Sequence, residues 1–355
     1  MIIKLLKYLY FLQRQNAKPQ GKLEQLEMAE EPPASFTQNL SLEKLINKWI
    51  DLNLEQMLTP YLTALGNWQN RRQSSFALVG FNGQGRNKVL ARLTSEQGVE
   101  PLCCPVKVTN KKDFQGIIAP NGLNDKDDLV SYLDSTRKIL VLEDCQNLML
   151  KTVGGFEALN EFLRIMSATW DRVFWVTSWE RTSWLYLEEI MDIGKFFTTV
   201  VYLRPVESEQ LQGLIEGMIA ELGYGVQHDE GFFGELAAEN RGLLSACYYW
   251  LLKEARLVKE RKILFNQPQY QIEGIDKLNE RETYALVSLI QNDGLDASLL
   301  SLVINEEPAV CEQILEKLMR MSLCTIRKGI YSINPAILPQ IFDYLEKQRY
   351  VYLAY

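Results

Sequence analysis

The fold of this chain is decided by the stretch SSFALVGFNGQGRNKVL, residues 74–90. An apolar segment that can form a buried strand leads into a loop with three glycines, and a segment of helix-forming residues follows. This order of strand, glycine-rich loop and helix is typical of a phosphate-binding loop. Glycines let the backbone turn its N–H groups inward, and the helix N-terminus adds partial positive charge, so such a loop stabilises an anion.

The loop has the spacing of the motif G-x-x-x-x-G-K-[ST] but lacks its two chemical residues. Arg86 stands at the lysine position and carries the charge on a wider planar group. Asn87 stands at the hydroxyl position, where its amide is a poorer Mg²⁺ ligand. Lys88 is one residue out of register, and we expect it to point elsewhere. An ordinary glycine-rich turn is the alternative. The residues predicted to contact a nucleotide are Gly80, Asn82, Gly83, Gln84, Gly85, Arg86 and Asn87.

Two further apolar runs end in polar residues. Residues 138–144 close with Glu143 and Asp144, and residues 172–178 close with Thr177 and Ser178. P-loop NTPases place one acid after a neighbouring buried strand to hold the Mg²⁺ shell, followed by a second acid that polarises water. The usual order is Asp then Glu. The reversed order here puts Glu143 at the metal position and Asp144 at the water position.

With these three strands, residues 37–350 resemble the AAA+ and STAND branches of the P-loop NTPases, with degenerate Walker A and B motifs. Residues 142–159 are also similar to ATPase domains attached to bacterial membrane proteins. The resemblance implies ATP or ADP as ligand, Mg²⁺ held by Asn87 and Glu143, and catalysis by Glu143, Asp144 and Thr177. Thr177 is at the position where AAA+ ATPases orient the attacking water. Because the motifs are altered, we expect weak or absent hydrolysis.

Composition sets the general class of the protein. The 355 residues exceed one typical domain, and 47% hydrophobic with 23% charged residues describes a globular chain. The net charge of −7 gives no general attraction to nucleic acid. A single histidine excludes a site built from several histidine ligands. Six scattered cysteines without a C-x-x-C pair favour reduced thiols and a cytoplasmic location.

The N-terminal residues 1–36 read as an amphipathic segment followed by a linker. Residues 1–14 are too few to span a bilayer, which takes about 20 apolar residues. As a helix they would place their basic residues on one side and their apolar residues on much of the rest, which suits peripheral contact at the inner face of a membrane. Docking on the protein and the stub of a longer chain are the alternatives.

The remaining sequence divides into three units. Residues 37–204 alternate strands and helices, which predicts an α/β core with a mainly parallel sheet. Residues 205–265 read as a helical lid. The resemblance implies a lid arginine that reaches the nucleotide, and Arg241 is the candidate, although the expected register falls on Ser245. Residues 275–355 have the order of a winged-helix domain, with a hairpin that turns at Arg327-Lys328-Gly329.

Three functions fit this organisation. The first is a nucleotide-binding regulatory module of AAA+/STAND type that controls contact with a protein partner or with a second copy. The second is a pseudo-ATPase scaffold without nucleotide. The third is a DNA-binding initiator or loader, which would use Arg327 and Lys328. The third helix of the winged helix, near residues 308–321, carries Glu312 and Glu316, whose repulsion of phosphates disfavours DNA.

Overall fold

The computed structural model describes residues 30–99, 101–105, 107–119, 129–133, 137–258 and 261–350. The amphipathic segment 1–14 lies outside these residues, so its membrane contact stays a prediction. Within the described ranges, no helix is both long enough and apolar enough to cross a membrane.

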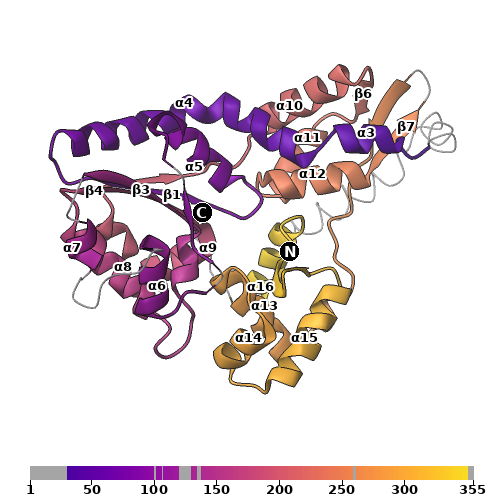
Figure 1. Cartoon of the computed structure of the whole chain (residues 1–355). Coiled ribbons are helices and arrows are strands. Elements are labelled where there is room, and N and C mark those ends of the chain that lie inside the picture. The colour runs from indigo at the N-terminus through magenta and orange to yellow at the C-terminus, as the bar shows by residue number, and fades with distance from the viewer. Residues whose placement is uncertain are drawn as a thin grey trace, which may run out of the picture.

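A five-stranded parallel sheet forms the core and confirms the expected α/β class (Figure 1). Its spatial order is β2-β3-β4-β1-β5. β1 and β4 are buried along their whole length, as expected for strands covered on both faces. Parallel strands end at one edge, so β1, β3 and β4 deliver their last residues to the same place. The strands are β1 (Ser75–Gly80), β2 (Leu102–Cys103), β3 (Lys138–Glu143), β4 (Val173–Glu180) and β5 (Thr199–Tyr202).

Helices cover the two faces of the sheet (Figure 1). Phe76 and Leu78 of β1 pack with α4 and α5, whereas Ala77 and Val79 belong to the apolar cluster around α6 to α9. α4 begins after Ser41, whose Oγ accepts from the Lys44 amide at 3.3 Å. The helices are α3 (Ala34–Asn39), α4 (Leu42–Gln69), α5 (Arg86–Thr94), α6 (Lys111–Ile118), α7 (Leu129–Leu133), α8 (Glu157–Ala168) and α9 (Arg181–Met191). Short 3-10 turns cover Ser95–Gln97, Cys145–Leu148 and Ile193–Phe196.

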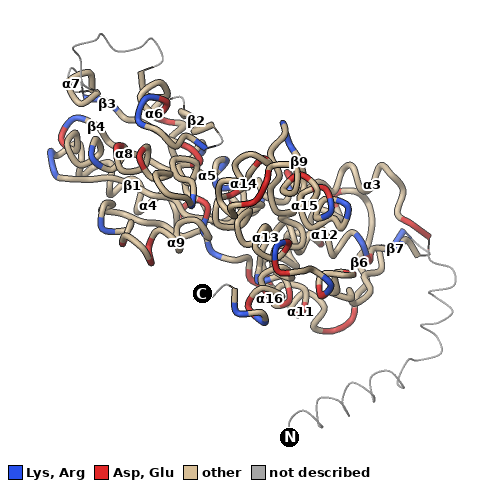
Figure 2. The backbone as a smooth tube through the Cα atoms, turned by 90° about the horizontal axis from the view of Figure 1, so that it is seen from below, with Lys and Arg blue, Asp and Glu red and all other residues tan. Residues whose placement is uncertain are grey.

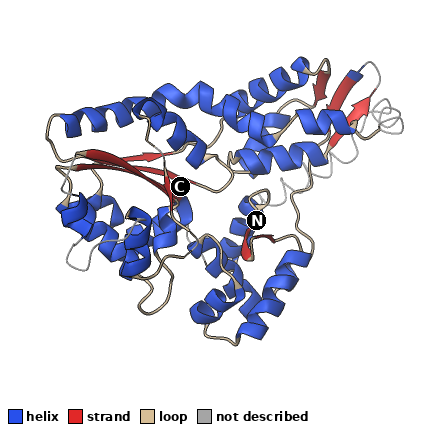
Figure 3. Cartoon of the chain, in the orientation of Figure 1, coloured by secondary structure: helices blue, strands red, loops and turns tan. Residues whose placement is uncertain are grey.

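The lid follows the core and contacts the half of α4 that lies farther from the core sheet (Figure 1). Its helices are α10 (Ser208–Glu221), α11 (Phe232–Glu239) and α12 (Leu244–Lys253). The lid also contains a small sheet in the order β6-β8-β7 that the sequence does not predict (Figure 3). The apolar pattern suggests a helix up to residue 259, but α12 ends at Lys253 and the chain turns into a strand. These strands are β6 (Gly225–His228), β7 (Ala255–Val258) and β8 (Lys262–Phe265).

The C-terminal unit has the element order of a winged helix, as predicted. Its first helix starts with a capping box in which Asn279 and Glu282 bind each other's backbone amides. The hairpin turns at Lys328 (φ 52°) and Gly329 (φ 81°), the two positive φ values of a type I′ turn. The elements are α13 (Glu280–Asn292), α14 (Ala297–Ile304), α15 (Pro308–Arg320), β9 (Cys324–Arg327), β10 (Ile330–Ile333) and α16 (Leu338–Lys347), and a 3-10 turn, Ile275–Lys277, precedes them.

The winged helix contacts both other units. Ser183 Oγ donates to the Gln291 carbonyl at 3.0 Å, which holds the end of α13 against α9 of the core. Arg241 of the lid binds Asp343 Oδ1 at 2.5 Å and Glu346 Oε2 at 2.8 Å on α16. The end of α13 therefore lies beside the carboxyl edge of the core sheet.

Candidate functional site

The glycine-rich loop connects β1 to α5, as the sequence predicts. Gly83 and Gly85 have φ of 85° and 77°, conformations that favour glycine. A Cβ on Gly85 would lie 2.4 Å from Ile46 Cγ2, so α4 also excludes a side chain there. The glycines therefore allow both the curl of the loop and its close approach to α4.

Arg86 is the centre of an ion-pair network at the first turn of α5. Its side chain is 8% exposed. Nη2 binds Asp144 Oδ1 at 2.7 Å and Asp293 Oδ2 at 3.3 Å, and Nη1 donates to Asn82 Oδ1 at 2.7 Å. Burial opposes its charge, but Asp293, Asp144 and Glu180 together raise the pKa of Arg86. Position 86 is therefore a permanent buried cation shared by the core and the winged helix.

Asp293 is the most distant of the network residues that the sequence does not predict. It follows α13 with a left-handed φ of 54°. Besides Arg86, it accepts hydrogen bonds from Asn82 Nδ2 and, at 2.6 Å, from Gln146 Nε2. No local pattern marks it, because it is 207 residues from Arg86 in the chain. Its carboxylate places a negative charge from the winged helix directly on the loop.

The two carboxylates at the end of β3 lie in different surroundings. Glu143 is still part of the strand, and no side-chain ion pair ties it to the loop residues described. Asp144 has a left-handed φ of 57° and faces Arg86 and Asn87 instead. Burial alone would raise the pKa of Asp144, but Arg86 and the bonds from Asn87 and Gln146 hold it below the usual range. Burial, with Asp144 nearby, raises the pKa of Glu143.

Ser178, rather than Thr177, faces the loop from β4. The Thr177 hydroxyl donates to the Phe76 carbonyl at 3.1 Å inside the sheet. The Ser178 hydroxyl donates to Asn87 Oδ1 at 2.9 Å and accepts from the Asp144 amide at 3.0 Å. Alternation along a strand explains the difference, because Ser178 shares the α5 face with Val176. The sequence alone could therefore have identified Ser178, because residues two apart in a strand share a face.

The lid and the winged helix close over the tip of the loop. A Cβ on Gly83 would lie 2.2 Å from Ser245 Oγ of α12 and 3.2 Å from Pro335 Cβ, which follows β10. Ser245 Oγ itself donates to the Pro335 carbonyl at 3.1 Å. Inside the loop, Gln84 Oε1 accepts from the Phe81 amide at 2.9 Å. Position 245 thus reaches the loop, as the register for a lid arginine implies, but offers a hydroxyl. Arg241 is engaged by α16 instead.

Glu180 adds a second buried carboxylate beside this network. It ends β4 and caps α9 by accepting from the Ser183 amide at 2.9 Å. Burial and the nearby Asp293 raise the pKa of Glu180 to about 7, against the opposing effect of Arg86. Lys107 is a second, partly buried cation near these carboxylates, and burial lowers its pKa to about 8 against the opposing effect of Asp293 and Glu180. The site therefore holds several buried titratable groups, which makes it sensitive to pH.

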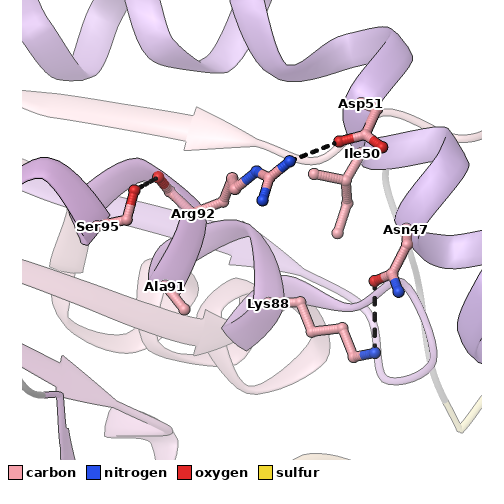
Figure 4. A pocket seen from close by; sticks show the side chains of 7 residues that line it. All are labelled: Asn47, Ile50, Asp51, Lys88, Ala91, Arg92 and Ser95. Carbon is pink, nitrogen blue, oxygen red and sulfur yellow. Dashed lines mark hydrogen bonds and ion pairs between the residues drawn. The ribbon is translucent and has the colours of Figure 1, made fainter.

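Lys88 is turned toward α4, as expected. Its Nζ binds Glu43 Oε1 at 2.6 Å and Asn47 Oδ1 at 3.4 Å, and Arg92 Nη2 binds Asp51 Oδ1 at 3.1 Å. Asn47, Asp51, Lys88 and Arg92 line a surface hollow of about 580 Å³ between α4 and α5 (Figure 4). Both cations of this hollow are paired, so it offers no excess positive charge.

A larger cleft of about 680 Å³ opens at the loop itself. One wall is formed by loop residues including Gly85, Arg86 and Asn87, and the opposite wall by the winged-helix hairpin with Arg327 and Lys328. This volume lies within the usual range for small-molecule sites. The Arg86 Nε is buried and has no acceptor among the described residues. The glycine cradle, the buried cation and the cleft together fit a phosphate-bearing ligand.

The same residues do not fit Mg²⁺. Both polar atoms of the Asn87 amide are bound, one to Asp144 and one to Ser178. Asp144 already accepts from Arg86, Asn87 and Gln146. Within the part of the chain that the structure describes, no three His, Cys, Asp or Glu side chains are grouped to hold a metal ion. The Arg86 guanidinium stands beside Asp144 where the motif would supply a divalent cation.

Comparisons with known proteins return only distant structural similarity. No protein-family model matches the chain, and no curated protein matches it. Among solved structures, it is similar to the RuvB Holliday junction branch migration motor of Thermotoga maritima, with 14% identity over 85% of this chain and 95% of that chain (TM-score 0.39). It is also similar to Cdc6p of Pyrobaculum aerophilum, with 17% identity over 84% and 94% (TM-score 0.39). ORC1 of Aeropyrum pernix in complex with DNA matches with 15% identity over 85% and 93% (TM-score 0.37). TM-scores this low carry no argument about function.

Proposed function

We propose that this protein is a nucleotide-binding regulatory module of AAA+/STAND type, in which ATP or ADP binds with weak or absent hydrolysis. The phosphates would bind at the glycine-rich loop and Arg86. Binding would then change the position of the winged helix, and with it the surface offered to a protein partner or a second copy. The single observation that carries the proposal is the shared ion pair of Arg86 with Asp144 of the core and Asp293 of the winged helix.

The ion pair supports a switch because both anions compete for one cation. A phosphate that binds Arg86 at Nη2 would displace or weaken the contact with Asp293. Asp293 is joined to the hairpin through Leu295 and Tyr331, whose backbones exchange two hydrogen bonds of 2.9 Å. A ligand shifts an equilibrium only by its different affinity for two states. Here that difference would come from the loss of the Asp293 contact when phosphate is bound.

Weak hydrolysis follows from the state of the catalytic positions. Asp144 is neutralised by Arg86 and hydrogen-bonded by Asn87, so it is a poor base toward water. The Ser178 hydroxyl is occupied by Asn87. Arg241, the predicted lid arginine, is held by two acids of α16. Binding energy rather than turnover would therefore drive the conformational change.

Isothermal titration with ATP and ADP tests the proposal. We expect binding heat for the wild type and an affinity at least about tenfold weaker for Arg86→Ala, because a charge-assisted contact is lost. Arg86→Lys, which keeps the charge, should retain binding. Arg92→Ala is the matched control, since Arg92 is an exposed arginine of the same helix that is paired with α4. Absence of heat with both nucleotides for the folded wild type would remove the proposal.

A pseudo-ATPase scaffold is the second candidate, and one observation favours it. The Gln84 side chain lies inside the loop and accepts a hydrogen bond from the Phe81 amide. Ser245 and Pro335 cover Gly83 from outside. In that case the three units would form a fixed platform for a partner protein. Its signature is a melting temperature that does not move when ATP or ADP is added.

DNA binding is the less favoured use of the winged helix. Glu312 and Glu316 are exposed on α15, and Lys317 of the same helix is bound to Glu282 on α13 at 2.7 Å. Figure 2 shows basic and acidic positions interspersed along the elements. An α15 surface of this kind offers little to a phosphate backbone.

A further inference from the structure

The hairpin of the winged helix forms the far wall of the cleft at the glycine-rich loop. Thr325, Arg327 and Lys328 line this cleft from the hairpin, opposite Gly85 and Arg86. The hairpin belongs to a different unit of the fold and comes from the other end of the chain. A ligand bound at the loop would therefore lie between the core and the hairpin turn.

Two sets of contacts fix the hairpin beside the loop. Asp293 binds Arg86 and Gln146 of the core, and Leu295, two residues later, exchanges backbone hydrogen bonds with Tyr331 of β10. On the other side, Pro335 accepts from Ser245 of the lid. β10 and the segment after it are thus held by contacts with the core on one side and with the lid on the other.

The charged side chains of the cleft are unevenly paired. Asp144 and Asp293 are both bound to Arg86, and Lys88 is bound to Glu43. Within the residues that the structure describes, Arg327 and Lys328 have no acid within ion-pair distance, and both are exposed. The cleft therefore presents two unneutralised cations across from the loop, and the turn that follows β9 is basic in Figure 2.

We propose that Arg327 and Lys328 are binding residues for the distal phosphates of a polyphosphate chain whose proximal end lies at the glycine-rich loop. This inference rests on the proposed function and assigns the ligand's terminal anion to the hairpin. The lid residues leave that position open, because Ser245 carries no charge and Arg241 is held by Asp343 and Glu346. Two adjacent cations match an anion that carries more than one charge.

Because the hairpin lies across the cleft from the loop, the length of the phosphate chain decides whether a ligand contacts Arg327 and Lys328. A ligand with more phosphates extends farther from the loop into the cleft toward the hairpin than a single phosphate does. The hairpin would then read the difference between a triphosphate and a shorter ligand. The same residues would connect that difference to the winged helix, since they are part of it.

Titration of the full chain with tripolyphosphate, ATP, ADP and AMP tests the inference. We compare the wild type with Arg327→Ala/Lys328→Ala and with Arg320→Ala, an exposed arginine at the end of α15 that does not line the cleft. The double variant should bind tripolyphosphate and ATP about tenfold more weakly, with a smaller loss for ADP and none for AMP. Arg320→Ala should bind all four like the wild type. Circular dichroism confirms that each variant is folded.

Three results would overturn the inference, and they are distinguishable. Equal affinities of the wild type and the double variant for tripolyphosphate and ATP remove the hairpin site and leave the proposed function standing. In a parallel titration with duplex DNA at low salt, a double variant that loses DNA affinity alone makes the hairpin a nucleic-acid contact instead. A wild type that binds none of the four ligands removes both the inference and the proposed function.

Discussion

Arg86 replaces the point charge of a motif lysine by a planar group with five N–H donors, and this difference sets the chemistry of the site. A guanidinium can bind two carboxylates at once, and Arg86 does so with Asp144 and Asp293. Breaking a buried pair on one side leaves an uncompensated charge, which is costly. A phosphate can provide the compensating charge when Asp293 leaves.

The residue scale also gives a pH prediction for Glu180. Its folded-state pKa is about 7, above the ordinary value of 4.5. The folded state therefore binds a proton that the unfolded state releases in this interval. The stabilising contribution is fully present below pH 4.5 and is lost as the pH rises to about 7. Glu180→Gln should remove this dependence, which amounts to about 3 kcal/mol at most.

Urea unfolding from pH 5 to pH 8 measures this dependence. The wild-type midpoint should fall with pH across the window, and the Glu180→Gln midpoint should change less. Glu209→Gln, at an exposed glutamate of α10, should keep the wild-type profile. Identical profiles for wild type and Glu180→Gln would show that Glu180 is ionised in the folded protein.

Some residues of the site can be predicted from the sequence alone, and others cannot. Arg86, Asn87 and the two carboxylates are visible from motif spacing alone. Asp144 rather than Glu143 faces Arg86 because its backbone is left-handed, which motif spacing does not reveal. Ser178 could have been preferred to Thr177 from strand parity, because Val176 and Ser178 share the face toward α5.

At the scale of elements, the loop between β1 and α5 is shaped by the helices that pack on it. α4 approaches Gly85 and α12 approaches Gly83, so both glycines serve packing as well as backbone conformation. The buried strands were predictable because β1 and β4 are mainly apolar, with a run of four or more apolar residues in each. The lid sheet was not, because β7 continues the apolar pattern of α12 and each of its strands has four residues.

Gly83→Ala tests the packing of the loop under the lid. The new Cβ would meet Ser245 Oγ at 2.2 Å, and φ of 85° is strained for alanine. We expect a loss of roughly 1–2 kcal/mol in the free energy of unfolding, or more if α12 cannot move. Gly217→Ala, in the exposed middle of α10 with open space around its Cβ, should stabilise by about 0.5–1 kcal/mol.

Chemical denaturation of the two alanine variants decides the point. A Gly83→Ala variant as stable as the wild type would mean that α12 does not pack against the loop. Hydrogen exchange adds a local measure, since displaced lid contacts should speed exchange in α12.

At the scale of the whole molecule, three units meet at one loop. The core supplies the cradle, the lid covers its tip through Ser245, and the winged helix supplies Asp293 and the hairpin. The sequence predicts each unit, including a hairpin that turns at Arg327-Lys328-Gly329, and the structure shows a type I′ turn there. It does not predict their meeting, because the contacts that join them are made by single residues far apart in the chain. Asp293 is the clearest case.

The central claim is that Asp293 and a nucleotide phosphate compete for Arg86. The most direct test is the ATP affinity of Asp293→Asn, measured by isothermal titration. Asparagine tolerates the left-handed backbone of this position and removes only the negative charge. The account predicts binding at least about fivefold tighter than the wild type, because an internal competitor is weakened. An affinity that is unchanged or weaker would contradict it.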